Sequence, residues 1–340
     1  MSRRGYLVVA SCLAIVAAGA VVFAVGTTPA SLGGATATGS GRQAPVLHAK
    51  GWINTAPLTP ADLRGKVVLY DFWTYSCVNC VRTIPTLRSW YDRYRQDGLV
   101  LIGVHSPEFD FEKNHGNVAR AVKKLGVDYP VALDDDMTIW NDFGNQYWPA
   151  DYLYDRNGRQ ASVHFGEGGY EKTEAEIRRL LAIPAAAPHA VVKGEEGGSV
   201  GSPDQTPETY NGAERGFQNF VSPEPLSIGE RRFSAPPMLQ PGEHALSGPW
   251  IVSEQYVEAA APGASLVLGY VAGQVNLVMS TASGQPTDVQ VQVDTQAPIT
   301  VHVTDADLYT LAADHTKGAH VVRLTAVTAG LRAFAFTFGG

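Results

Sequence analysis

The sequence contains few cysteines and no excess of positive charge. Three cysteines in 340 residues cannot form a disulfide framework, although they allow one reactive pair. With 26 Lys+Arg against 33 Asp+Glu, the net charge of -7 argues against nucleic acid as a partner. Hydrophobic residues make up 45% of the chain and aromatic residues 9%, which excludes disorder throughout. A length of 340 residues suggests two domains.

Long hydrophobic runs are also scarce, with one exception near the N-terminus. Residues 6–26 carry no charge, and 21 such residues in a helix span a hydrocarbon core of about 30 Å. Two arginines precede the run, so residues 1–26 are predicted to be a signal anchor in the cell membrane, with the bulk of the chain outside the cytoplasm. Cleavage near residues 35–37 would instead give a secreted protein. Cys12 ends a lipobox-like stretch, but fits better as a small hydrophobic residue within the run.

The rest of the chain divides by composition into two domains and two connecting segments. Residues 27–46 are small and polar, which predicts a flexible tether. Residues 47–183 alternate apolar strands with amphipathic helices, which indicates an α/β domain. Residues 184–205 are rich in Pro, Gly and Ala and are predicted to be a linker. Residues 206–340 contain alternating runs such as DVQVQV and RAFAFTF, which predict an antiparallel β-sandwich or jelly roll.

Two of the cysteines form a C-x-x-C pair directly after an apolar strand. Cys77 is predicted to stand at the opening of a helix, where free backbone N–H groups and the helix dipole stabilise a thiolate. Cys80 follows by about one turn, within reach of disulfide geometry. We therefore identify Cys77 as the candidate nucleophile and Cys80 as the candidate resolving thiol of a redox-active disulfide.

Asp71 interrupts the apolar strand that precedes the pair. A buried carboxyl group has a raised pKa and could exchange a proton with Cys80. An exposed Asp on an edge strand is the alternative, but the run KVVLYDFW is too apolar for an edge. We therefore include Asp71 among the candidate catalytic residues.

Two structural explanations for the C-x-x-C pair are weaker than the redox one. A structural zinc site needs four ligands, yet the sequence has no second C-x-x-C and its nine histidines are scattered. A purely structural disulfide that closes so short a loop would constrain the unfolded chain little. No metal and no cofactor is therefore expected.

The segment DFWTYSCVNC, with Pro85 five residues after the second cysteine, resembles the active-site strand and first helix of the thioredoxin superfamily. The flanking segments PLTPADLRGKVVLYDFW and YWPADYLYDRNGRQ are similar to its TlpA/DsbE-like branch. Over residues 46–340 the chain resembles the soluble part of DipZ-type proteins even more, in which a thioredoxin-like domain precedes a carbohydrate-binding-module-like β domain. The resemblance implies a thioredoxin-like fold and thiol:disulfide oxidoreductase activity.

The resemblance also implies roles for residues outside the cysteine pair. Trp148–Pro149 would be a cis peptide that faces the cysteines and pairs with an incoming substrate chain. Trp73, Tyr75 and Trp148 would form an apolar, partly exposed rim around the sulfurs, although each could equally fill the core. Glu108 could point toward the site, but a solvated loop acid is the preferred interpretation.

Two departures from the family limit what the resemblance implies. DipZ-type proteins carry a multi-span membrane domain that relays electrons, whereas this chain has one hydrophobic run. Its electrons would therefore come from a separate membrane protein of the CcdA/DsbD type. Between the cysteines, Val78-Asn79 replaces the Gly-Pro of thioredoxin, and this dipeptide helps to set the reduction potential. The direction of the reaction, reduction or oxidation, stays open.

The second domain offers no catalytic constellation. A carbohydrate-binding resemblance would call for an exposed aromatic platform, and Trp250, Tyr256 and Tyr270 are the candidates. In a sandwich of this size such residues lie more often in the core. Contact with cell-wall glycan is thus an expectation without an assigned binding residue.

Taken together, the sequence predicts a membrane-tethered thiol:disulfide oxidoreductase outside the cytoplasm. Its substrates would be oxidised envelope proteins, in cytochrome c maturation or redox homeostasis. One alternative is a thiol peroxidase, which needs an arginine beside the reactive cysteine; Arg82 lies shortly after Cys80. Another is an envelope glycan-binding or scaffolding protein with an auxiliary thioredoxin-like unit.

Overall fold

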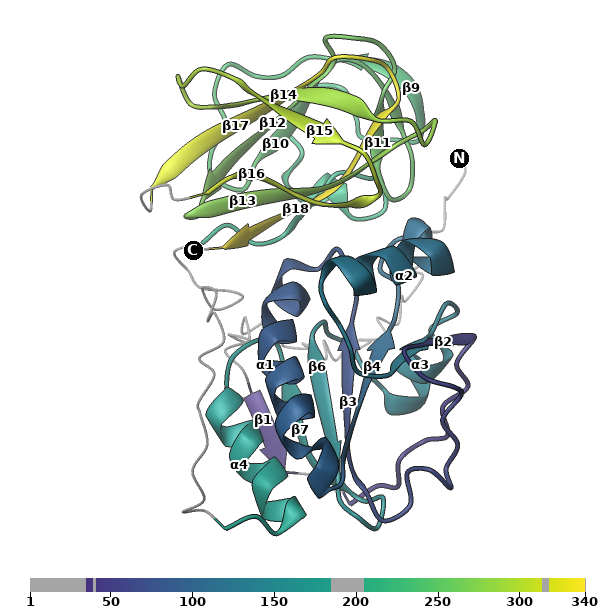
Figure 1. The fold of residues 1–340 in the computed structure, drawn as a ribbon. Helices are drawn as coiled ribbons and strands as arrows, with labels where there is room; N and C mark the ends of the chain where they lie inside the picture. Colours follow the sequence, from purple (N-terminus) through teal and green to yellow (C-terminus); the bar gives the residue numbers. More distant parts are fainter. Residues whose placement is uncertain (1–34, 39–40, 185–204, 314–317, 340) are drawn as a thin grey trace, which may run out of the picture. The chain divides into compact units, whose positions relative to one another are not determined.

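The structure is a computed structural model and describes residues 35–38, 41–184, 205–313 and 318–339 (Figure 1). The predicted signal anchor, and most of the predicted tether and linker, lie outside these residues. Within the described ranges, no helix is both long and apolar enough to cross a membrane. Ala35–Thr38, inside the predicted flexible tether, forms strand β1 and pairs with β7 (Gln160–Phe165), so that part of the tether prediction is wrong.

The first domain contains a mixed sheet of seven strands in the order β1-β7-β6-β3-β4-β5-β2. β3 pairs in parallel with β4, and β4 in parallel with β5, whereas the other neighbours are antiparallel. The strands not yet located are β2 (Gly51–Ile53), β3 (Val67–Trp73), β4 (Leu99–His105), β5 (Val131–Leu133) and β6 (Ala150–Tyr154).

β3 lies in the centre of the sheet and is buried along its whole length. Because side chains alternate along a strand, Leu69 and Trp73 face one hydrophobic cluster while Tyr70 and Phe72 face another. A strand covered on both faces reads as a continuous apolar run, which is why KVVLYDFW predicted a central strand correctly.

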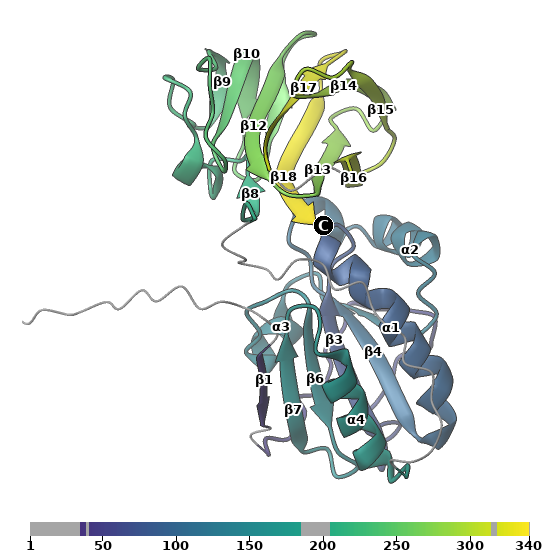
Figure 2. The same cartoon turned by 90° about the vertical axis from the view of Figure 1, so that its left-hand side faces the viewer.

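Helices cover both faces of this sheet (Figure 2). The first cluster also contains buried residues of α1, α2 and α4, and the second contains those of α3. These helices are α1 (Val78–Tyr94), α2 (His115–Lys124), α3 (Thr138–Phe143) and α4 (Tyr170–Leu181), with short 3-10 helices η1 (Arg95–Asp97) and η2 (Asp110–Lys113). The predicted α/β domain is confirmed.

The second domain is an all-antiparallel sheet of eleven strands. They are β8 (Thr209–Tyr210), β9 (Gly229–Phe233), β10 (His244–Val252), β11 (Val257–Ala259), β12 (Ser265–Val271), β13 (Gln274–Thr281), β14 (Thr287–Val293), β15 (Ile299–Val303), β16 (Asp307–Ala312), β17 (Ala319–Ala326) and β18 (Leu331–Gly339). A short helix, η3 (Gly216–Asn219), follows β8.

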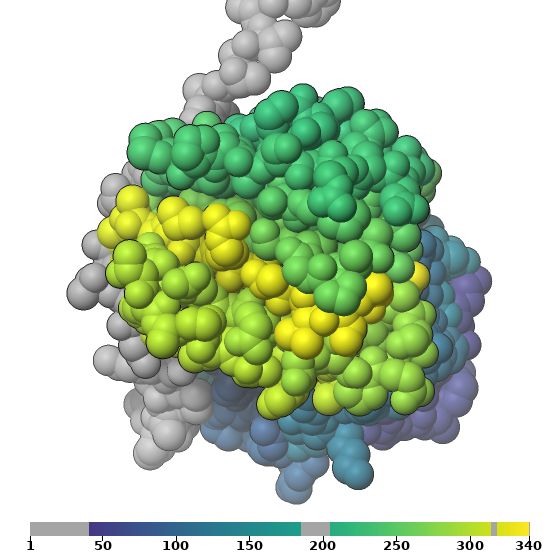
Figure 3. Space-filling model, turned by 90° about the horizontal axis from the view of Figure 1, so that it is seen from above, coloured from purple at the N-terminus to yellow at the C-terminus, as the bar shows by residue number. Residues whose placement is uncertain are grey.

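Hydrogen bonding connects these strands into one barrel-like sheet, because β10 pairs with β12 on one side and with β11 on the other. The predicted antiparallel β domain is therefore confirmed, while the strands form a single sheet rather than two separate ones. In the space-filling view, the last residues, in yellow, run between earlier green segments (Figure 3). That arrangement agrees with the placement of β17 beside β12 and of β18 beside β13.

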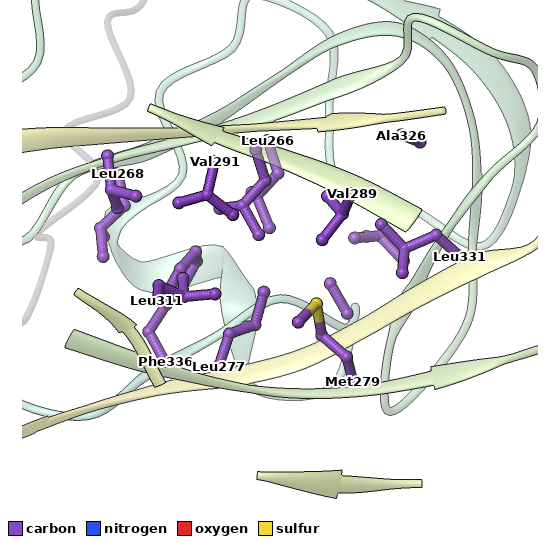
Figure 4. Packing of buried hydrophobic residues seen from close by; sticks show 14 of the residues in the cluster. Leu266, Leu268, Leu277, Met279, Val289, Val291, Leu311, Ala326, Leu331 and Phe336 are labelled. Atoms are coloured by element: carbon purple, nitrogen blue, oxygen red, sulfur yellow. The ribbon is translucent and has the colours of Figure 1, made fainter. Parts of the chain in front are cut away.

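The core of the β domain lies between facing strands of the curved sheet (Figure 4). Leu266 and Val291 come from one side and meet Leu277 and Met279 from the other. Trp250 and Tyr270 belong to the same core and are fully buried. They cannot serve as the exposed aromatic platform for which they were candidates.

A smaller cluster joins the two domains. Phe109, which follows β4, lies 5.1 Å from the ring of Phe334 on β18, and Phe111 lies 4.9 Å from the same ring. Tyr256, the third platform candidate, packs 5.1 Å from Phe334 and is only partly exposed. The ion pairs Arg120–Asp305 (3.0 Å) and Lys124–Asp307 (2.6 Å) also connect α2 to the second domain.

Candidate functional site

Cys77 caps the N-terminus of α1. Its backbone is extended, with φ -80° and ψ 112°, and its Sγ accepts the backbone N–H of Cys80 at 3.2 Å. A sulfur that accepts a helix N-terminal N–H is placed where negative charge is favoured. The side chain is partly exposed, and in the described structure the residue is a free cysteine, not in a disulfide. The predicted position at the helix opening is confirmed.

Cys80 lies one turn further along α1 and is completely buried. Burial raises the pKa of the Cys80 thiol well above its usual range, and the hydrogen bond to Cys77 and the nearby Asp71 raise it further. A group that attacks from outside can therefore reach Cys77 but not Cys80. Protons leaving or entering at Cys80 need a carrier inside the protein.

Asp71 is buried at the middle of β3, on the face that packs against α1. Burial raises the pKa of its carboxyl group well above the usual range, and Asp151 on β6 raises it further. The expectation that Asp71 is buried is confirmed. Its role in moving a proton stays a prediction.

The Trp148–Pro149 peptide is cis, as predicted. The indole Nε1 of Trp148 donates to the carbonyl of Ser106 at 3.1 Å, and the indole ring packs on Trp140 with centroids 4.1 Å apart. Trp148 lines the same cleft as Cys77. Contact of Pro149 with a substrate chain stays a prediction.

Trp73 and Tyr75 do not form an exposed rim, which corrects the expectation for both. Trp73 is fully buried because its position on β3 faces the core under α1. Tyr75 is also buried and stacks on His105 with centroids 5.7 Å apart. Burial lowers the pKa of His105 to about 3, so this ring is neutral at physiological pH. Both aromatic residues support the loop before Cys77 from inside.

A cleft of about 380 Å³ opens at Cys77 and is lined by residues of both domains. Glu108 lies in its wall with a side chain only 8% exposed, so the interpretation as a solvated loop acid is wrong. Its Oε1 accepts from Arg215 and from the hydroxyl of Tyr210, each at 2.8 Å. The guanidinium of Arg215 also lies 3.7 Å from the centre of the Tyr210 ring. These bonds explain why Glu108 faces inward.

Glu112 was missed in the sequence because its role depends on contacts between distant loops. Its Oε1 accepts the hydroxyl of Ser76 at 2.6 Å, and its Oε2 accepts the backbone N–H groups of Glu108 and Phe109 at 2.7 and 2.9 Å. Burial raises the pKa of Glu112, and the hydrogen bond from Ser76 opposes this rise. The carboxylate thereby ties the loop before Cys77 to the loop after β4.

Arg82 and the possible metal ligands bear on the alternative functions. Arg82 donates to Asn79 and Glu167, each at 3.2 Å, and to the carbonyl of Phe338 at 3.3 Å. Its guanidinium forms an ion pair with Glu167, and none of these contacts directs it toward a reactive sulfur. Among the residues that the structure describes, no group of three or more His, Cys, Asp or Glu side chains could hold a metal ion.

Comparison with known families matches both halves of the chain. Residues 40–160 match the AhpC/TSA family, and residues 206–339 match the thioredoxin like C-terminal domain. The thiol-disulfide oxidoreductase YkuV of Bacillus subtilis is 30% identical over 134 residues, which cover 39% of this chain and 89% of YkuV. The chain belongs to the thioredoxin-like thiol-disulfide oxidoreductases. This family membership confirms the predicted enzyme class.

Two further proteins are similar to this chain, one over most of its length and the other over less than half of it. Protein DipZ of Mycobacterium tuberculosis is 38% identical over 300 residues, which cover 85% of this chain. The chain spans only 41% of the length of DipZ. A solved thiol-disulfide isomerase from Corynebacterium glutamicum is 25% identical, with a TM-score of 0.38 over 41% of this chain and 97% of that one.

Proposed function

We propose that this oxidoreductase works outside the cytoplasm, tethered to the membrane by residues 1–26, and reduces disulfides of envelope proteins. Cys77 is the attacking thiol and Cys80 the resolving thiol. The observation that carries this assignment is the contrast between the two sulfurs: Cys77 is partly exposed in a cleft, whereas Cys80 is buried one turn behind it.

The proposed reaction has two exchange steps. The Cys77 thiolate attacks one sulfur of the substrate disulfide, so that a mixed disulfide forms and the other substrate sulfur leaves as a thiolate. Cys80 then loses its proton and attacks the sulfur of Cys77, which releases the second substrate thiolate. The substrate gains two electrons, and the Cys77–Cys80 pair becomes a disulfide. A membrane electron donor of the CcdA/DsbD type returns two electrons to the pair.

The cleft supports a preference for disulfides on extended segments. Its walls come from the Trp148 loop on one side and from Glu208, Tyr210 and Phe338 of the second domain on the other. A cleft of about 380 Å³ at Cys77 favours a narrow, flexible segment over a broad, flat folded surface. A flexible strand that pairs beside Pro149 could present its disulfide to Cys77.

The two alternative functions receive less support. For a thiol peroxidase, the nearest arginine in sequence, Arg82, is engaged by Glu167. For a glycan-binding scaffold, two platform candidates are buried and Tyr256 packs against Phe334. Thiol-disulfide oxidoreductase activity explains the cysteine pair without a peroxidase or a glycan-binding function.

Cys80→Ala tests the assigned roles. Removal of the resolving thiol should leave mixed disulfides between Cys77 and its substrates, visible as bands on a non-reducing gel that vanish with reductant. Cys77→Ala is the matched control and should trap nothing. Equal trapping by both variants, or by neither, would contradict the assignment.

The reduction potential of the Cys77/Cys80 pair tests the direction of the reaction. Equilibration of the purified chain with glutathione should give a value near the roughly -270 mV of thioredoxin if the protein is a reductant. A value near the roughly -120 mV of a strong oxidant would mean that the protein introduces disulfides instead.

A further inference from the structure

A row of polar residues crosses the sheet beneath the cysteine pair, in which Asp71 and His164 are buried and Asp151 is partly buried. Asp71 on β3 lies directly opposite Asp151 on β6, and Asp151 lies opposite His164 on β7. Directly opposed residues on antiparallel strands project to the same face, with Cβ atoms about 4.5–5.5 Å apart. The sheet therefore brings two carboxyl groups together on the side where α1 carries Cys80.

Three of the four carboxyl oxygens of this pair are buried without a hydrogen-bond donor. Both oxygens of Asp71 and the Oδ1 of Asp151 are buried and accept no hydrogen bond from any described residue. Burial raises the pKa of Asp151 as well as that of Asp71. Two carboxylates so close together, one buried and the other partly buried, resist being ionised at the same time, so one proton is retained between them.

The groups that face the pair from the surrounding elements carry no positive charge. On the other side of β3, the position opposite Asp71 is Gly103 of β4. A Cβ there would lie 2.8 Å from the Nε1 of Trp73 and 3.1 Å from the ring of Tyr129, so no basic side chain fits.

The remaining neighbours are also neutral at physiological pH. α1 contributes Cys80 and the segment before β5 contributes Tyr129, and burial raises the pKa of both. β7 contributes His164, whose pKa is lowered by burial. None of the groups that shift the pKa of Asp71, Asp151 or Cys80 is a lysine or an arginine.

We propose that Asp71 and Asp151 share a single proton and that Asp151 is a positioning residue for proton transfer at Cys80. The pair then holds one proton and one vacant acceptor oxygen over a wide pH range. It takes the Cys80 proton when Cys80 attacks Cys77. It returns a proton when a donor thiolate attacks Cys77 of the oxidised pair and Cys80 leaves as a buried thiolate. This inference rests on the proposed roles of the two cysteines.

Asp151→Asn in the full-length chain tests whether the proton is shared. Carboxyl 13C NMR of aspartate-labelled protein follows the titration of Asp71, which is assigned by its loss in Asp71→Asn. In the wild type, the Asp71–Asp151 pair loses its last proton at a certain pH. This pH should be at least about one unit higher than the pH at which Asp71 loses its proton in Asp151→Asn. Asp92→Asn, which removes an exposed carboxylate from α1, is the control and should not move the titration. An unchanged titration in Asp151→Asn overturns the proposal.

Reduction of the oxidised chain by dithiothreitol gives a second readout that a purely structural role would not move. At each pH, the reduction rate of the wild type is divided by that of Asp151→Asn. This ratio does not depend on the thiolate fraction of dithiothreitol, which is the same for both proteins. This ratio should rise with pH by up to about tenfold per pH unit between the two titrations, because the variant has already lost its proton. A ratio that is constant with pH contradicts the proposal.

The two experiments also separate this proposal from the one on which it rests. If Cys80→Ala fails to trap substrates, the assignment of the resolving thiol fails, while the NMR titration still reports whether Asp71 and Asp151 share a proton.

Discussion

At the scale of single residues, the site is defined by groups that are buried against their electrostatic preference. Asp71 on β3 and Cys80 on α1 are both buried between the sheet and this helix, where burial disfavours a charge on either. Such groups weaken the folded state and are therefore candidates for function. Their effect on stability can be measured separately from catalysis.

Asp71→Asn should make the folded protein more stable at alkaline pH. The pKa of Asp71 is raised in the folded state, so its favourable contribution is complete below the unfolded value of about 3.9 and is lost as pH rises through the folded pKa. Over that window the wild type loses up to about 1.4 kcal/mol of unfolding free energy per pH unit from this group. Urea denaturation from pH 4 to 9 measures the difference, which should grow in favour of the variant. A difference that stays constant with pH would mean that Asp71 is ionised at no cost.

At the scale of elements, the sequence pattern predicted those helices and strands that are determined by residues close together in the chain. The apolar run of β3 and the C-x-x-C at the start of α1 were predicted correctly, because burial on both faces and helix capping leave a local signature. The residue that lies opposite Asp71 in the sheet was not predicted. Asp151 lies 80 positions later in the chain, and only the order of strands in the sheet brings it opposite Asp71.

The loop before α1 depends in the same way on a distant element, η2. Glu112→Ala should lower the free energy of unfolding by about 3 kcal/mol, because it leaves the hydroxyl of Ser76 and two backbone N–H groups buried without their acceptor. Urea denaturation at pH 7 measures this loss. Glu176→Ala, which breaks a surface ion pair with Arg179 on α4, is the control and should change stability by less than about 0.5 kcal/mol. Equal effects of the two variants would show that Glu112 does not hold the loops together.

At the scale of the whole molecule, the second domain contributes to the reactive cleft. Glu108 was interpreted as a loop acid because nothing near it in sequence suggests a partner, yet it pairs with Arg215, 107 positions away. The aromatic contact of Phe109 and Phe111 with Phe334 lies beside this ion pair. Contacts between domains leave no local pattern, so the sequence predicted two domains without predicting that they share a site.

Phe334→Ala should widen access to Cys77. Loss of the ring removes its packing on Phe109 and Phe111, which at a buried site costs about 3–5 kcal/mol, and the walls of the cleft are then held less firmly. In the wild type, a bulky maleimide should modify Cys77 much more slowly than the small N-ethylmaleimide, and the ratio of the two rates should move toward that of an open thiol in the variant. Phe217→Ala is the control, since this ring is 60% exposed in the same domain and should leave the ratio unchanged. If the ratio is the same in the wild type and in Phe334→Ala, the second domain does not restrict access to Cys77, and substrate size is limited by the thioredoxin-like domain alone.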